Sequence, residues 1–447
     1  MLAISQSFKK RKLLFIKGAI IIMDEYKVIP KETGLDHSLS VLKEGYHFIT
    51  NRCTGFQSDI FQTRLLGEEV ICLRGSEGAK LFYDNSKMKR NGAAPSKMLK
   101  TLLGEKGVQT LDEAEHLHRK KMFMSLMTTD SLKEIRTITK NHWNQVVELW
   151  RNKKEITLYD EAKKVMCRTA CEWAGVPLKE EEVEKRAKQL SNMIEGTASV
   201  GPKDVKARIA RAQTEKWIEE LIKEVRKGNR EIEKEKTLYV FSNFRKLDGE
   251  LLDSQIAAVE IINILRPIVA VSIYICFTVL AMEQHQEEVK KLKQTDEKTL
   301  ERFVQEVRRF YPFFPFAVAR TKEEFIWDEY VFPKEQLVLL DLYGTNHHPD
   351  LWENPEIFNP GRFNNWKGTP FNFIPQGGGN HDEGHRCAGE FITIEIMKET
   401  LLFFAKDISY TLPHQDVSFS FNQMPSIPNS GIILTNVEIN NKTKRER

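Results

Sequence analysis

The fold is decided by one stretch of the sequence, Phe373-Ile-Pro-Gln-Gly-Gly-Gly-Asn-His-Asp-Glu-Gly-His-Arg-Cys-Ala-Gly389, a glycine-rich loop that runs directly into an amphipathic helix. Its glycines let the backbone approach a flat cofactor closely, because glycine has no Cβ. Cys387 ends the loop, and we expect the amides of the helix start, together with His385 and Arg386, to lower the pKa of its thiol. Such a thiolate suits an axial ligand of haem iron, and the alternative is a lone buried cysteine beside a surface loop.

This stretch resembles the haem-binding loop of the cytochrome P450 superfamily, in which a loop rich in Phe and Gly precedes the thiolate Cys and a Gly follows two residues later. Cys387 and Gly389 fit that pattern. The loop departs from it by extra residues between Phe373 and Cys387, and by His385 where most members have an arginine, which indicates a subfamily. The resemblance implies haem b with Cys387 as the iron ligand and with His385 and Arg386 among the cofactor-binding residues.

Composition and charge exclude some classes of protein. The chain has 447 residues, of which 41% are hydrophobic and 29% are charged, and this allows a large buried core. It exceeds the roughly 250–300 residues at which cores usually divide, so one two-lobed fold and two domains are both open. The 67 basic and 63 acidic residues leave a formal net charge of +4, which predicts no nucleic-acid partner.

The cysteines show neither zinc-ligand spacing nor a disulfide framework. They are Cys53, Cys72, Cys167, Cys171, Cys276 and Cys387. We therefore expect reduced thiols and a cytoplasmic protein. Cys167 and Cys171 lie one helical turn apart and could be a metal pair, but the sequence offers no matching second pair, which favours core packing.

Helical periodicity dominates the sequence from Asp36 onward. Short β-rich pieces interrupt it at residues 70–73, 336–340 and 431–434. The sequence therefore predicts a mainly α fold with small β-sheets, and the resemblance implies the cytochrome P450 fold, with haem between a long central helix and the cysteine loop. Because no repeat or Gly/Ser linker divides the chain, we expect one catalytic domain over residues 23–447.

Residues 1–22 imitate a signal peptide or a short anchor, because the basic run 9–12 precedes the apolar run 13–22. The apolar run is shorter than the about 20 residues that cross a bilayer, and Lys17 interrupts it. An alternative is that Met23 is the true start and that residues 1–22 are an upstream extension. Intact-mass analysis of the native protein would decide between the two starts.

The most hydrophobic segment covers residues 254–282 and is the membrane candidate by composition. It contains Glu260, Asn263, Arg266 and Pro267, and a lipid-exposed span with such residues would be unfavourable. We therefore expect a buried helix and no integral membrane segment. In the superfamily, the corresponding helix crosses directly over the haem.

Mid-helix, most cytochrome P450 monooxygenases have an acid and a threonine that relay protons to iron-bound dioxygen. This chain has Leu265-Arg-Pro-Ile-Val269 there, and none of the residues that share a helix face with Arg266 within one turn is acidic. A buried guanidinium without a partner costs several kcal/mol, so a substrate carboxylate is the expected partner; a salt bridge to an acid elsewhere in the fold is the alternative. Pro267 removes a hydrogen bond to the Asn263 carbonyl and is expected to kink the helix.

The Arg266–Pro267 pair, the thiolate loop and the missing acid–alcohol pair together resemble the bacterial fatty-acid peroxygenase family of cytochrome P450 enzymes, from about Leu35 to Val437. The resemblance implies that the carboxylate of a long-chain fatty acid pairs with Arg266 and serves as the general acid–base for hydrogen peroxide. No redox partner is then required. It also implies hydroxylation at the α and β carbons, with minor decarboxylation to terminal alkenes.

The resemblance assigns further residues around the cofactor and substrate. Arg90, His116 and Lys120 match haem-propionate ligands, and Thr110-Leu-Asp-Glu113 has the pattern of a capping box that would start the helix of His116 and Lys120. Surface cations are the alternative for all three. Further matches are Gln109 in the distal pocket, where glutamine favours hydroxylation, and Leu103 and Phe313 along the substrate channel, for which core packing is the alternative.

Glu306 and Arg309 share one helix face, and Arg362 can complete the buried Glu–Arg–Arg network of the superfamily, a structural site that holds the haem loop. Two other functions stay open from sequence. One is a monooxygenase that receives electrons from a ferredoxin or flavodoxin, which the missing acid–alcohol pair disfavours. The other is a fatty-acid or haem-binding protein without turnover, which Cys387 and Arg266 disfavour.

Overall fold

Helices make up most of the structure, a computed structural model that describes residues 13–16, 19–22, 26–199, 201–292 and 296–440. The α-helices are α1 (Ser38–Glu44), α2 (Phe48–Phe56), α3 (Gly75–Phe82), α4 (Ser96–Met98), α5 (Glu113–Met124), α6 (Thr129–Trp150), α7 (Leu158–Ala174), α8 (Val183–Glu195), α9 (Pro202–Arg226), α10 (Thr237–Ser242), α11 (Ser254–Gln284), α12 (Gln286–Leu292), α13 (Glu297–Phe310), α14 (Leu342–Asn346) and α15 (Glu390–Leu402). Single turns of other helix types are η1 (Gly45–His47), η2 (Leu99–Leu103), η3 (Val108–Thr110), η4 (Glu180–Glu182), η5 (Pro360–Phe363) and η6 (Phe403–Asp407).

Within the described residues, the strands form four small sheets. They are β1 (Leu13–Ile16), β2 (Ala19–Ile22), β3 (Ile60–Leu65), β4 (Glu68–Leu73), β5 (Met88–Lys89), β6 (Glu155–Thr157), β7 (Phe316–Thr321), β8 (Phe325–Trp327), β9 (Tyr330–Phe332), β10 (Leu337–Asp341), β11 (Ile408–Thr411) and β12 (Ile433–Ile439). The largest sheet has the order β3-β4-β10-β7-β5, in which only β10 and β4 run parallel. The others are β11-β12-β6, β8-β9 and β1-β2.

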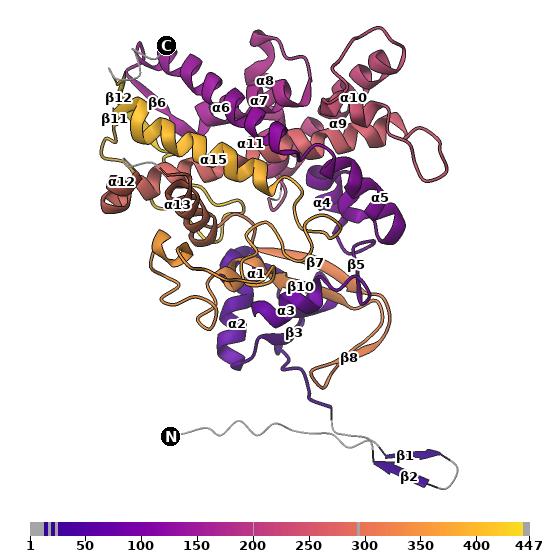
Figure 1. Ribbon diagram of the computed structural model, residues 1–447. Coiled ribbons are helices and arrows are strands. Elements are labelled where there is room, and N and C mark those ends of the chain that lie inside the picture. The colour runs from indigo at the N-terminus through magenta and orange to yellow at the C-terminus, as the bar shows by residue number, and fades with distance from the viewer. Residues whose placement is uncertain (1–12, 17–18, 23–25, 200, 293–295, 441–447) are drawn as a thin grey trace.

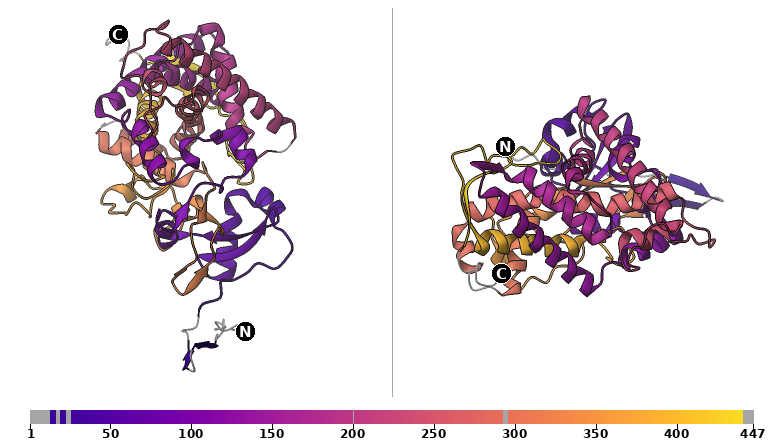
Figure 2. Two further views of the ribbon diagram at one scale, coloured as in Figure 1. Left: turned by 90° about the vertical axis from the view of Figure 1, so that its right-hand side faces the viewer. Right: turned by 90° about the horizontal axis from the view of Figure 1, so that it is seen from above.

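The molecule has a helical part and a sheet part. Figure 1 shows α6, α7, α9, α11 and α15 together in its upper half, and the five-stranded sheet with α1, α2 and α3 in its lower half. The side view in Figure 2 shows the same division. The loop between η5 and α15 runs between the two parts and carries Cys387 to the start of α15.

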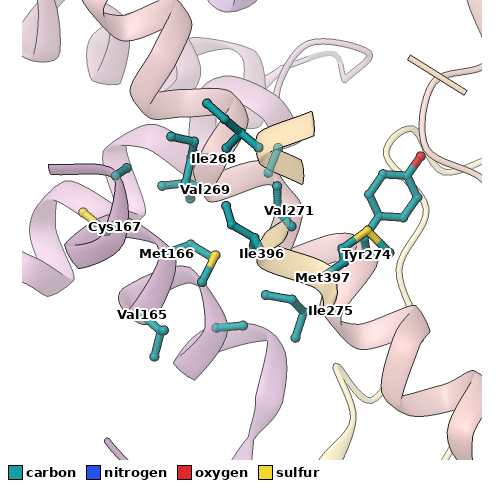
Figure 3. Close-up of a cluster of buried hydrophobic side chains, with 14 of the residues drawn as sticks. Val165, Met166, Cys167, Ile268, Val269, Val271, Tyr274, Ile275, Ile396 and Met397 are labelled. Carbon is teal, nitrogen blue, oxygen red and sulfur yellow. The ribbon is translucent and has the colours of Figure 1, made fainter. Parts of the chain in front are cut away.

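The core is built around α11. Its start is capped by Asp253, whose carboxylate accepts hydrogen bonds from the amides of Gln255 and Ile256, and apart from Pro267 every residue from Ala257 to Met282 is buried. Figure 3 shows its side chains packed against α7 and α15, with Val165, Met166, Cys167, Ile268, Val269, Val271, Tyr274, Ile275, Ile396 and Met397 labelled. Within the described ranges, α11 is the single helix long and apolar enough to cross a membrane, and 94% of its most apolar window is buried inside the fold. The prediction of a buried core helix is confirmed.

The expected fold class is confirmed, and the three predicted β-rich pieces lie in or beside β4, β10 and β12. Cys167 and Cys171 are buried on α7, as core packing requires. Residues 13–16 and 19–22 of the N-terminal apolar run form the antiparallel pair β1–β2, while residues 1–12, 17–18 and 23–25, which include Met23, lie outside the described residues. The alternative start at Met23 and the single domain over residues 23–447 stay predictions.

Candidate active site

The cysteine loop is anchored at both ends. On one side, the amide of Ile374 donates to the side-chain oxygen of Asn346 over 2.9 Å. On the other, the Cys387 amide donates to the carbonyl of Gln376 over 3.2 Å, and the Gln376 side chain approaches the Cys387 sulfur at 3.8 Å. Gly377 has φ +92°, and a Cβ there would stand 3.0 Å from the Tyr83 hydroxyl, so the turn favours glycine.

The extra residues of this loop form a small turn of their own. The Asn380 side-chain oxygen accepts from the amides of Asp382 and Glu383 over 2.8 and 3.1 Å, and its carbonyl accepts from the Gly384 amide over 3.0 Å. Asn380, Asp382 and Glu383 are exposed. The insertion therefore closes on itself at the surface before the chain returns to Cys387.

The expectation that the loop itself lowers the pKa of Cys387 is wrong. Burial raises the pKa of the Cys387 thiol, the negative charge of Glu390 raises it further, and the positive charge of Lys120 lowers it less. Arg386 is paired with Glu390, its Nε lying 2.6 Å from a carboxylate oxygen, and burial lowers the pKa of His385 well below its ordinary value, so that ring is neutral. A bound metal would have the opposite effect, because it deprotonates a coordinating thiol.

Basic side chains from two segments, the one after β5 and helix α5, meet beside this loop. Arg90, His116 and Lys120 are all buried, and the ring of His116 stacks on that of His385 at 3.8 Å. Burial lowers the pKa of Arg90 to about 10 and that of Lys120 to about 8, and burial with the neighbouring positive charges lowers the pKa of His116 to about 4. Arg90 Nη1 finds no hydrogen-bond partner among the residues that the structure describes. Asp112 is the nearby carboxylate, 4.0 Å from His385 Nε2, but among the described residues no carboxylate forms a salt bridge with Arg90, His116 or Lys120. The carboxylates of haem propionates fit such a buried basic cluster.

The helix that carries His116 and Lys120 does not begin with the predicted capping box. Its first residue is Glu113 and its N-cap is Asp112, whose side chain caps no amide of the helix. Instead the Asp112 carboxylate accepts from the amides of Arg90 and Asn91 over 2.7 and 2.9 Å. Asp112 thus holds the Arg90 segment against the helix, although it is 22 residues away in sequence.

Arg266 lies on α11 and is 5% exposed. Its Nη2 donates to the Asn263 side-chain oxygen over 3.3 Å, and its Nε has no partner among the described residues. Burial and the positive charge of Arg211 lower the pKa of Arg266 to about 9. No carboxylate of the described residues forms a salt bridge with Arg266, because the neighbouring Glu260 and Glu215 pair with other arginines. The alternative of an internal salt bridge is therefore not found.

A polar network that the sequence analysis missed surrounds Arg266. The Asn263 amide nitrogen donates to Glu260 and to Gln109, each over 3.1 Å. The other oxygen of Glu260 accepts from Arg119 over 2.8 Å. Glu260, Asn263 and Arg266 recur every three residues, which places them along one side of α11, and this spacing was the signal that could have indicated the network.

The comparisons with known proteins agree with this arrangement. Residues 37–434 match the family model of cytochrome P450. The chain is a cytochrome P450. It is 52% identical to cytochrome P450EX alpha (CYP152N1), solved with myristic acid, with a TM-score of 0.90 over 93% of this chain and 100% of that one.

Two further solved structures are similar. Cytochrome P450SP alpha (CYP152B1), in complex with (R)-ibuprophen, is 40% identical with a TM-score of 0.89 over 91% of this chain and 100% of that one. A variant of cytochrome P450 OleT in complex with arachidonic acid is 35% identical with a TM-score of 0.90 over 92% of this chain and 99% of that one. These similarities place this cytochrome P450 among the fatty-acid peroxygenases, oxidoreductases that carry a cysteine-ligated haem b.

The buried Glu–Arg–Arg network predicted for Glu306, Arg309 and Arg362 is present in the cytochrome P450. Arg309 Nη2 lies 2.8 Å and Arg362 Nε 3.1 Å from the Glu306 carboxylate, and all three side chains are at most 9% exposed. Arg309 Nη1 donates to the Asn346 carbonyl over 3.0 Å. Because the side chain of Asn346 binds the Ile374 amide, the network reaches the cysteine loop through Asn346.

The contacts of Leu103 and Phe313 in this cytochrome P450 are those of packed core residues. Leu103 lies in η2 and is partly buried against the main core. The Phe313 ring stacks on Tyr274 of α11 at 4.2 Å, and its carbonyl accepts from the Tyr46 hydroxyl over 2.8 Å. These contacts account for both residues by packing, and their place along a substrate channel stays a prediction.

Proposed function

We propose that this fatty-acid peroxygenase uses hydrogen peroxide to hydroxylate long-chain fatty acids at the α and β carbons, with minor decarboxylation to terminal alkenes. The observation that carries the proposal is the buried Arg266 on the central helix, which has a hydrogen bond to Asn263 and no carboxylate partner among the described residues. A fatty-acid carboxylate supplies the missing anion. Similar proteins have been solved with myristic and arachidonic acids, both long-chain fatty acids.

The cofactor site follows from the cysteine loop and the basic cluster. Cys387 would hold the haem iron through its sulfur. We propose that three basic residues hold the propionates, namely Arg90, His116 and Lys120. His385 and Arg386 are proposed to bind the cofactor beside the cysteine. When bound, haem supplies the redox-active iron at which peroxide is activated.

The substrate carboxylate has two tasks in this proposal. Paired with Arg266, it removes the cost of a buried unpaired guanidinium and raises the pKa of Arg266 again. One carboxylate oxygen then takes a proton from hydrogen peroxide and returns it to the oxygen that leaves as water, so that each turnover converts fatty acid and peroxide into hydroxy acid and water. A fixed carboxylate brings the α and β carbons nearest to the reacting centre.

Pro267 and Gln109 complete the proposed distal side. Pro267 has no amide hydrogen, so the Asn263 carbonyl one turn earlier receives no helix hydrogen bond from it. Gln109, on η3, accepts from Asn263 and is partly exposed, which suits a residue that orients the distal pocket. Leu103 and Phe313 are proposed to contact the fatty-acid chain.

The second candidate is a fatty-acid monooxygenase supplied with electrons by a reductase. Its proton relay needs an acid and an alcohol at the middle of α11, where this chain has Arg266 and Pro267. We therefore propose that no redox partner is required. We also propose that the enzyme acts in the cytoplasm.

The deciding experiment mixes purified ferric protein with myristic acid and hydrogen peroxide, without NAD(P)H or redox proteins, and identifies products by gas chromatography–mass spectrometry. Formation of 2- and 3-hydroxymyristate, with a smaller amount of tridecene, is expected. No product from a protein with a thiolate-type haem spectrum would contradict the proposal and favour the reductase-dependent reaction.

A further inference from the structure

Glu260 is a fully buried carboxylate at the meeting point of α11, α5 and η3. One of its oxygens accepts from the Val108 amide and from Arg119 Nη1, each over 2.8 Å. The other accepts from the Asn263 amide nitrogen over 3.1 Å. Three donors from three segments therefore converge on a side chain with no exposed surface.

The chemistry of these groups fixes which way the Asn263 amide faces. Burial raises the pKa of Glu260, but the carboxylate pairs with the Arg119 guanidinium at 2.8 Å, which favours its ionised form. An ionised carboxylate only accepts hydrogen bonds and a guanidinium only donates them, so Asn263 must turn its NH₂ to Glu260 and its oxygen to Arg266. The distances agree, with 3.1 Å from Nδ2 to Glu260 and 3.3 Å from Arg266 Nη2 to Oδ1.

The orientation of the Asn263 amide also determines which group of Gln109 it contacts. The second hydrogen of the Asn263 NH₂ is donated to the Gln109 oxygen over 3.1 Å. The Gln109 NH₂ is therefore not used in this contact, and it has no protein partner in the part of the chain that the structure describes. Gly107 makes room for this contact, because a Cβ there would stand 3.0 Å from Asn263 Nδ2 and 3.2 Å from the Gln109 oxygen.

We propose that Glu260 is a positioning residue of the substrate site: through the Asn263 amide it presents an acceptor to Arg266 and leaves the Gln109 NH₂ as a donor toward the fatty-acid carboxylate. This inference rests on the proposed function, because it assumes that Arg266 and Gln109 bind the carboxylate of the fatty acid. It adds a residue that does not itself touch the substrate.

Glu260→Gln tests the proposal with little change in shape. Glutamine has one acceptor oxygen, which Val108 and Arg119 occupy, so its NH₂ faces Asn263. To accept from this NH₂, Asn263 must rotate its amide, and its own NH₂ then faces Arg266. The Asn263 NH₂ and the Arg266 guanidinium are both donors, so their hydrogen bond is lost. We expect the dissociation constant of myristic acid, measured by spectral titration of the ferric holoenzyme, to rise about tenfold, as for loss of one charge-assisted hydrogen bond.

A double-mutant cycle with Asn263→Leu separates positioning from general destabilisation. Because the link runs through Asn263, Glu260→Gln should leave the dissociation constant unchanged within about twofold once Asn263 is leucine. If Glu260→Gln does not yield holoenzyme, Glu260→Asp takes its place in the same cycle, and its weaker binding must likewise vanish beside Asn263→Leu. An unchanged dissociation constant, or an equal loss in both backgrounds, overturns the proposal.

Glu399→Gln is the matched control, since Glu399 is also a buried carboxylate, 5% exposed, that pairs with one arginine, Arg136, at 3.0 Å. It should lower thermal stability without changing myristate binding. The peroxide assay is run in parallel on the wild type. Myristate binding without product there would refute the proposed reaction alone, whereas intact wild-type turnover with an unaltered Glu260→Gln dissociation constant would refute the positioning role alone.

Discussion

Replacing Arg266 by methionine should stabilise the fatty-acid-free protein, although it removes a residue proposed to be essential. Burial and Arg211 lower the pKa of Arg266 from 12.5 to about 9. At 1.36 kcal/mol for each pH unit, this sets an upper limit of about 5 kcal/mol on the cost of the charge. Apolar replacements of buried ionic groups have stabilised other proteins by about 1–4 kcal/mol, so we expect a gain of about 2 kcal/mol.

The assay is calorimetric unfolding of the ferric holoenzyme with and without myristic acid. With an unfolding entropy of about 2.1 cal/mol/K per residue, 1 kcal/mol changes the Tm of a chain of this length by about 1 °C, so Arg266→Met should melt about 2 °C higher than wild type. Myristate at a hundred times its dissociation constant should stabilise the wild type by about 2.7 kcal/mol and the variant far less. The order of the two melting temperatures then reverses.

Arg211→Met is the matched control, because Arg211 is a buried arginine that does have partners. It donates to the Leu102 carbonyl over 3.1 Å and pairs with Glu215, so its replacement should lower the Tm. A lower Tm for Arg266→Met without fatty acid, or equal stabilisation of variant and wild type by myristate, would refute the reasoning.

Three further predictions concern the cofactor loop, its support and the pH dependence of stability. Cys387→Ser should fold but lose the thiolate-type absorption spectrum of the ferrous carbon-monoxide complex, and retention of that spectrum would exclude Cys387 as ligand. Glu306→Gln leaves Arg309 and Arg362 without their carboxylate, and should lower the free energy of unfolding in urea by about 3–5 kcal/mol together with the haem content. Burial raises the pKa of Asp341 to about 6 from an ordinary 3.8, so the folded state holds its proton more tightly. Stability should therefore fall by up to about 3 kcal/mol as the pH rises from about 4 to about 6, and Asp341→Asn should flatten this dependence in urea titrations.

Local patterns predicted the parts of the site that lie within one element. The apolar segment with Arg266 and Pro267 was correctly assigned to a buried helix, because its polar residues exclude a lipid-exposed span. The sequence also predicted the cysteine loop and the Glu306–Arg309 ion pair, because each is formed by residues close together in the chain.

Contacts between distant segments could not be read from the sequence. The capping-box pattern ending at Glu113 failed because Asp112 bonds to the amides of Arg90 and Asn91, 22 and 21 residues away, in place of its own helix. Glu260 meets Arg119 and Val108 across separations of 141 and 152 residues.

The error on Cys387 has a similar origin. Neighbouring residues suggested a lowered pKa, but the sign of the shift is set by burial, which depends on the whole fold.

The self-contained turn at Asn380–Gly384 has a consequence for how this loop can vary. The chain is fastened before the turn at Ile374 and after it at Cys387, so a change in the length of the tip need not move Cys387. The entropy of closing a flexible loop grows slowly, by about 0.6 kcal/mol for each doubling of its length. The tip is therefore a point where homologous sequences can gain or lose residues cheaply, and where a short epitope or fluorophore-binding peptide can be inserted while the cofactor stays in register.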